Sequence, residues 1–123
     1  MKVSNLFKLP HPLPNEELFE FLLQGSDMRV ERIVSHGQTT PAGQWYDQQQ
    51  DEWVILLKGK ATLMLLDTDT TIVNLVAGDY LFIPAHQKHR VEFTSHQPPC
   101  VWLAIHGQFD SFDNSLGDIS PKS

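Results

Sequence analysis

Two short segments of the chain carry carboxylate and imidazole side chains at positions that could bind a metal ion or transfer a proton. Glu52 opens a strongly apolar run, and by strand alternation it shares a face with Val54 and Leu56. A carboxylate on an inward face is costly unless it is paired, hydrogen-bonded or bound to a metal ion. Glu52 is therefore a candidate ligand, and a solvated position at the rim of the strand is the alternative.

Histidines supply the second part of the candidate site. His89 opens a later apolar segment and shares a face with Val91, and His86 precedes it by three residues across a turn. Imidazole is the commonest side-chain ligand for several transition metals, and two histidines that flank a turn can reach one ion. His106 ends the last apolar segment on the face of Trp102, where it is either a pocket residue or a hydrogen-bonded core side chain.

Strands must position these residues. Alternating or continuous apolar patterns predict strands over 28–35, 52–58, 61–67, 71–76, 80–83, 89–94 and 100–106. Short strands at a spacing of roughly ten residues, with no helix pattern between them, predict a sandwich or barrel rather than a parallel sheet. The tripeptide Lys58-Gly59-Lys60 predicts a tight hairpin turn between two of these strands.

The N-terminal part of the chain has a different pattern. Prolines at positions 10, 12 and 14 exclude a helix at the start, and Asn15 then fits the cap of a helix whose apolar stripe ends before Gly25. The sequence therefore predicts an extended segment and a short helix over residues 1–27, a barrel over 28–108 and a C-terminal tail over 109–123.

The two candidate segments resemble the two motifs of the cupin superfamily. Its first motif is Gly, five residues, His-x-His, three or four residues, Glu, six residues and Gly, and Glu52 and Gly59 fit the second half. Its second motif is Gly, five residues, Pro-x-Gly, two residues and His. Gly78, Pro84 and His89 fit it, with His86 in the place of the glycine. The resemblance implies an all-β jelly-roll barrel of the cupin type with one short N-terminal helix.

The His-x-His pair of the first motif is absent from this chain. With a three-residue gap its places are taken by Tyr46 and Gln48, and with a four-residue gap by Trp45 and Asp47. Strand alternation favours the first alignment, because positions 46, 48 and 52 then share a face. Ligand chemistry favours the second, because the carboxylate of Asp47 can bind a cation.

The usual cupin site holds one divalent metal ion with three histidines and one glutamate. The resemblance therefore implies a Zn, Mn, Fe or Ni ion bound by Glu52 and His89, with Asp47 and His86 completing the ligand set and Gln48 as the alternative to Asp47. The residues expected to contact a bound small molecule are Tyr46, Gln48 and His106. A metal-free pocket whose polar groups bind an organic ligand is the alternative.

Composition narrows the class of partner. The 123 residues carry a net charge of −6, which argues against binding to nucleic acid or to an anionic membrane. The single cysteine excludes an internal disulfide, and no signal peptide is evident, so we expect a cytoplasmic protein. Strands 52–57 and 63–66 are apolar on both faces, which predicts a homodimer.

The expected function is the binding of a divalent metal ion, a small molecule or both inside the barrel. A metal-dependent enzyme acting on a small molecule, such as an isomerase, dioxygenase or lyase, is one form of this function. A non-catalytic sensor without an open metal position is the other, and the sequence leaves the choice between them open.

Overall fold

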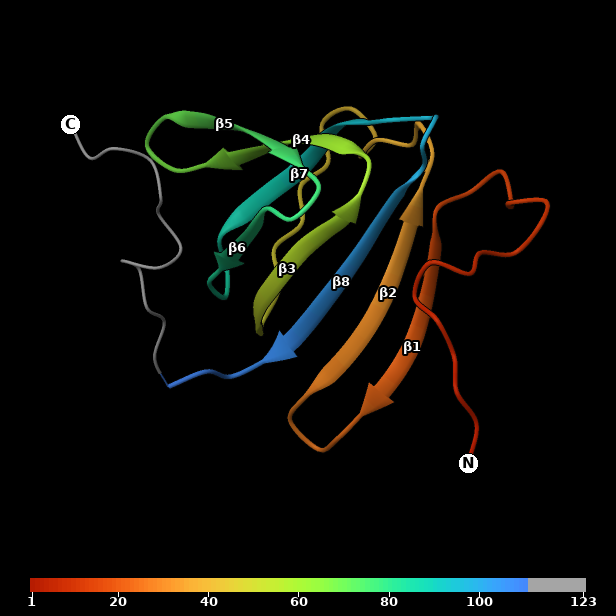
Figure 1. The fold of residues 1–123 in the computed structure, drawn as a ribbon. Coiled ribbons are helices and arrows are strands. Elements are labelled where there is room, and N and C mark those ends of the chain that lie inside the picture. The colour runs from red at the N-terminus through yellow and green to blue at the C-terminus, as the bar shows by residue number, and fades with distance from the viewer. Residues whose placement is uncertain (111–123) are drawn as a thin grey trace.

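The computed structural model describes residues 1–110, which form two antiparallel sheets that face each other (Figure 1). One sheet has the strand order β1-β2-β8-β3-β6 and the other the order β5-β4-β7. The strands are β1 Leu18–Gln24, β2 Arg29–Ser35, β3 Asp51–Lys58, β4 Lys60–Leu66, β5 Thr70–Val76, β6 Tyr80–Ile83, β7 Lys88–Thr94 and β8 Cys100–Gly107. Every strand predicted from the sequence is present, with its ends displaced by at most one residue.

The predicted N-terminal helix is wrong, because this segment forms strand β1 at the edge of the larger sheet. β1 pairs antiparallel with β2, and Glu20 lies opposite Arg32, whose guanidinium bonds it at 2.6 Å. An isolated helix of this length is marginal in water, whereas pairing with β2 satisfies the backbone of a segment that contains two phenylalanines. Tertiary pairing therefore overrides the helical spacing of the leucines and phenylalanines.

A second difference concerns the turn at Gly59. β3 and β4 do not pair with each other, and the chain crosses at Gly59 from the larger sheet to the smaller one. Gly59 has a φ of 94°, and a Cβ there would lie 2.9 Å from Cα and Sγ of Cys100. Glycine is therefore required at this corner both by its conformation and by the close approach of β8.

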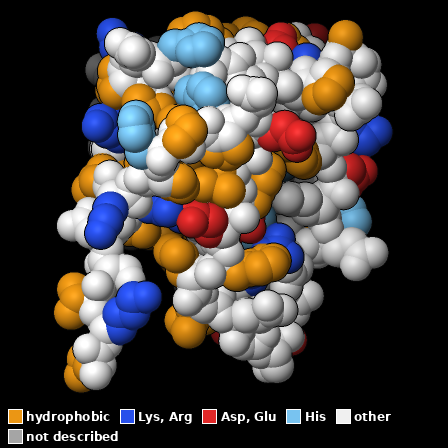
Figure 2. Space-filling view, turned by 90° about the vertical axis from the view of Figure 1, so that its right-hand side faces the viewer, with side chains coloured by type: hydrophobic (Ala, Val, Ile, Leu, Met, Phe, Trp, Pro, Cys, Tyr) orange, Lys and Arg blue, Asp and Glu red, His pale blue; other side chains and the backbone are white. Residues whose placement is uncertain are grey.

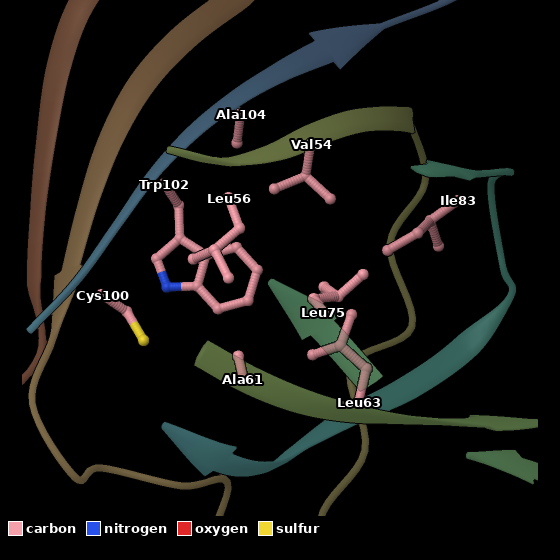
Figure 3. Packing of buried hydrophobic residues seen from close by; sticks show 9 residues of the cluster. All are labelled: Val54, Leu56, Ala61, Leu63, Leu75, Ile83, Cys100, Trp102 and Ala104. Atoms are coloured by element: carbon pink, nitrogen blue, oxygen red, sulfur yellow. The ribbon is translucent and has the colours of Figure 1, made fainter. Parts of the chain in front are cut away.

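The hydrophobic core lies between the two sheets. Val54 and Leu56 from β3 meet Ala61 and Leu63 from β4, and the indole of Trp102 lies against them (Figure 3). Leu56 has no exposed surface. Val54, Leu63 and Trp102 also form part of the wall of a cavity, so the core fixes the apolar side of the candidate site.

The predicted C-terminal tail lies outside the described residues from position 111 onwards. Within residues 1–110 there is no helix that could span a membrane.

Candidate functional site

Glu52 lies inside the barrel. It shares the inward face of β3 with Val54 and Leu56, and it is 7% exposed. In the sheet it lies opposite Ile83 of β6 on one side and opposite His106 of β8 on the other. The alternation predicted from the sequence thus places this carboxylate between two strands that carry other parts of the site.

His89 faces Glu52 across the cavity. Its Nδ1 donates a hydrogen bond to the carbonyl oxygen of Gln87 at 2.9 Å. Since a neutral imidazole carries one proton, Nε2 is left as the acceptor, and it lies 3.9 Å from Oε1 of Glu52. The ring of Tyr46 stacks on His89 with centroids 5.4 Å apart, and the two backbones are joined by a pair of hydrogen bonds. The arrangement fixes both the orientation and the tautomer of the histidine, as metal ligands require.

His106 forms the third part of the site, together with Glu31 from β2. Nε2 of His106 is 2.9 Å from Oε1 of Glu31 and 4.0 Å from Oε2 of Glu52. His106 and Glu31 are 2% and 7% exposed. Two carboxylates and two imidazoles from four strands are therefore gathered in one buried cluster.

These side chains line a cavity of about 80 Å³ that opens to the surface. One part of its wall is apolar and consists of Phe19, Ile33, Val54, Leu63, Ile83, Val91 and Trp102. The polar part consists of Glu17, Glu31, Tyr46, Gln48, Glu52, His89 and His106. Apolar walls with a few convergent polar groups are typical of small-molecule sites, and this cavity is at the small end for such a site.

The alignment with the shorter gap is the one that brings its residues to the cavity. Tyr46 and Gln48 both line it, together with Glu52, His89 and His106. Asp47 and His86 do not reach it. They pair with each other at 2.9 Å on the surface, with side chains 43% and 66% exposed.

His86 stands in the place of the glycine of the second motif and has a positive φ. Its φ is 66°, in the left-handed region that residues other than glycine seldom adopt. Its N–H donates a hydrogen bond to the carbonyl oxygen of Gln48 at 2.7 Å. His86 therefore shapes the turn that supports Gln48 and His89, while its ring points to Asp47.

Burial controls the electrostatics of the cavity. Desolvation raises the pKa of Glu52 above its usual range, and the imidazoles of His106 and His89 oppose this shift. Desolvation also raises the pKa of Tyr46, and the nearby carboxylates of Glu17, Glu52 and Glu31 add to the shift. At the cavity mouth, burial raises the pKa of Glu17, which accepts a hydrogen bond from Ser35. Negative charge in the cavity is thus disfavoured until a cation compensates for it.

Sequence reasoning missed Glu17, Glu31 and Arg29. Glu31 alternates with Ile33 on the inward face of β2, so the same period of two that identified Glu52 could have found it. Arg29 lies on the same face, opposite His106 in β8. Glu17 lies in the first turn of the helix expected after Asn15, and no signal in the sequence places it at a cavity.

The donors in the cavity fit a divalent cation, though not as a complete cage. Glu52 and His89 offer a buried carboxylate and an imidazole nitrogen that face each other, and Gln48 adds an amide oxygen to the same wall. In residues 1–110, no three side chains of the types His, Cys, Asp and Glu are arranged to hold a metal ion. Two preformed protein ligands would leave the remaining positions to water or to a bound molecule.

Comparisons with known proteins agree with this fold. In the solved structure of a candidate mannose-6-phosphate isomerase from Ralstonia eutropha JMP134, the whole chain matches 89% of this chain, with a TM-score of 0.80 and 42% identity. A cupin superfamily protein from Desulfitobacterium hafniense DCB-2 is 20% identical over 86% of this chain and its full length, with a TM-score of 0.64, and shows the same fold.

Among curated proteins, quercetin 2,3-dioxygenase from Bacillus subtilis strain 168 is 31% identical over 100 residues, or 80% of this chain. This chain covers 26% of the length of that dioxygenase. The family model of the cupin domain matches residues 30–106, which span β2 to β8 and both motifs. With its two facing sheets and with Glu52 and His89 at matching motif positions inside the barrel, this chain belongs to the cupin family.

Proposed function

We propose that this chain binds a divalent metal ion between Glu52 and His89 and acts on a small organic molecule bound beside it. The observation that carries the proposal is the pairing of these two groups. Nε2 of His89 is held as an acceptor and faces a buried carboxylate 3.9 Å away, and a cation between them would bind to both groups at once.

The chemistry of such a site follows from its open positions. A divalent ion bound there would act as a Lewis acid on a carbonyl or hydroxyl oxygen of the substrate. Tyr46 and Gln48 line the same cavity and would orient the molecule, while the apolar wall excludes water from one side. The hydrogen-bonded pair of His106 and Glu31 lies next to Glu52 and can hold or accept a proton.

Two relatives support a small-molecule reaction without identifying the substrate. One is described as a candidate mannose-6-phosphate isomerase and the other as a quercetin dioxygenase. Both names concern small organic molecules rich in oxygen. Isomerisation and oxygenation of such molecules are therefore the reaction types that we place first for this chain.

A non-catalytic cupin that binds a small molecule without a metal ion is the second candidate. The observation that favours it is the direct bond of 2.9 Å between His106 and Glu31, which already satisfies the nitrogen closest to Glu52 on that side. In this case Glu52, whose pKa is raised by burial, would take up a proton more readily than an exposed glutamate and, once protonated, would donate a hydrogen bond to the ligand.

Metal loading of the wild-type protein distinguishes the two candidates. Protein purified without an affinity tag is stripped with a chelator, incubated with Zn, Mn, Fe(II) or Ni salts, desalted and analysed for metal content. We expect about one metal ion per chain for at least one of these ions, because two buried ligands face each other. Protein that stays metal-free with all four salts would rule out the metal-dependent function and leave the second candidate.

We also propose that the chain forms a homodimer through the β1 side of the molecule. Hydrophobic side chains gather on that side (Figure 2), and Phe19, Phe21 and Leu23 are 52%, 66% and 66% exposed. β1 is an edge strand and can meet a second copy of itself across a two-fold axis. Phe19 also lines the cavity, so a partner there would narrow its mouth. A cytoplasmic location stays a prediction.

The dimer is tested by light scattering. The wild-type protein should have twice the chain mass of 14.0 kDa at micromolar concentration. Leu23→Lys should shift the mass to that of one chain, since it places a charge in the apolar contact. The control is Ile72→Lys on β5, because Ile72 is 51% exposed on the other sheet. A monomeric wild-type protein, or a dimer that Leu23→Lys leaves intact, would contradict the proposal.

A further inference from the structure

Arg29 at the start of β2 is bonded less completely than the other two arginines of the chain. Arg32 donates to Glu20 and to two backbone carbonyl oxygens, and Arg90 donates to Glu92 and to three. In residues 1–110, the only buried side-chain nitrogen or oxygen without a hydrogen-bond partner is Nε of Arg29. A buried charged donor without a partner is costly, so this nitrogen marks a place where an acceptor is expected.

The guanidinium of Arg29 is nevertheless held in place. Its Cζ lies 5.7 Å from the centroid of the Phe21 ring on the neighbouring strand. In the sheet, Arg29 lies opposite His106 of β8. In the described part of the chain, Arg29 forms no ion pair within 4 Å. The positive charge is therefore held in place without a direct ion pair, and the carboxylate of Glu52 is near enough for its pKa to be lowered by Arg29.

A hollow of about 330 Å³ lies over this guanidinium. Its lining consists of Arg29, His106 and the three consecutive glutamines Gln48, Gln49 and Gln50. None of these residues has a carboxyl group, and the three amides add N–H donors beside the guanidinium. This lining differs in kind from the cavity at Glu52, which contains three carboxylates.

The hollow and the cavity are neighbours, because Gln48 and His106 line both. A guanidinium with amide donors beside it matches the geometry of a carboxylate or a phosphate. The acid-rich cavity on the other side of Gln48 and His106 suits a cation. One small molecule can therefore contact both places when it carries an oxyanion at one end.

From this we infer that Arg29 and the glutamines Gln48–Gln50 form a subsite for the anionic group of the small molecule that the barrel binds. The ligand class is then a small organic anion whose oxyanion, a carboxylate or a phosphate, bonds to the guanidinium of Arg29. The inference rests on the proposed function, because it assigns the charged end of the same ligand.

The experiment uses chelator-treated, metal-free protein with inorganic phosphate and succinate as separate probes at constant ionic strength. We expect at least one probe to bind in isothermal titration calorimetry, and Arg29→Gln to weaken its binding at least about tenfold. Arg29→Lys keeps the positive charge but loses the planar, bidentate donors of the guanidinium, so it should weaken binding of the probe as well. Lys58→Gln on the exposed end of β3 removes the same charge elsewhere and should leave binding unchanged.

A measurement on the wild-type protein tests the subsite even if a variant does not fold. The NMR signal of the Arg29 Nε–H should shift on addition of the probe that binds. Binding of phosphate alone would indicate a phosphate ester, and binding of succinate alone a carboxylic acid. If neither probe binds, or if Arg29→Gln binds as the wild type does, the subsite is refuted. Because the protein is metal-free here, this failure is distinct from a failure of metal loading.

Discussion

Glu52→Ala and His89→Ala should each lower the affinity for the bound divalent ion by at least about 100-fold. Loss of a residue that merely supports a ligand commonly costs ten- to 100-fold in metal affinity, so loss of one of two facing ligands should cost at least as much. Both side chains are less than 10% exposed and point into the same cavity. Competition with a chromogenic chelator measures the affinity of each variant.

Four further variants serve as controls for this experiment. His11→Ala and His96→Ala remove exposed imidazoles away from the cavity and should bind the ion as the wild type does. Asp47→Ala and His86→Ala should also bind it, because these side chains pair with each other on the surface. If either of the last two lost the ion while Glu52→Ala kept it, the ion would be bound at the surface pair of Asp47 and His86 and not between Glu52 and His89.

The fold of this chain was largely predictable because its strands follow simple patterns. The apolar run from Trp53 to Leu57 and the alternation around Glu52 are typical of a strand, and the sequence there shows no helical pattern. The segment from Leu18 to Gln24 was not predictable in the same way. Its leucines and phenylalanines fit a helical stripe, and only the ladder formed with β2 selects the strand.

The candidate site was predictable where it depends on strand alternation and on the motif spacing. Glu52 and His89 lie inside the barrel because a strand presents alternate residues to one face. The turn before His89 follows no such rule. The left-handed backbone of His86 turns its ring outward to Asp47, and this conformation cannot be inferred from residue types alone.

Arg29 and Glu31 show a different limit of the sequence. Both lie on the inward face of β2, but neither belongs to a cupin motif, and an isolated charged residue on a strand is usually solvated. Alternation with Ile33 could have placed both on the inward face of β2. The register of β2 with β8, which sets Arg29 opposite His106 and Glu31 opposite Ala104, shows which part of the site each residue reaches, and this register needs the structure.

The stability of the metal-free protein should fall as the pH rises. The substitution Glu52→Gln should remove much of this fall. Burial raises the pKa of Glu52 in the folded state above the unfolded value of about 4.3. The folded state then binds the proton more tightly. The stabilisation is fully present below the unfolded pKa and is lost as the pH rises through the folded pKa. Each unit between the two pKa values corresponds to about 1.4 kcal/mol.

Urea unfolding in the presence of a chelator, at a series of pH values from about 4 to 8, measures this dependence. Glutamine stays neutral, so the variant should be more stable than the wild type at the upper end of the series. Glu16→Gln on the exposed N-terminal segment is the matched control and should follow the wild type. A Glu52→Gln profile parallel to the wild type would contradict the prediction. Adding the metal ion should stabilise the wild type most at the upper end, where the ion replaces the proton on the carboxylate.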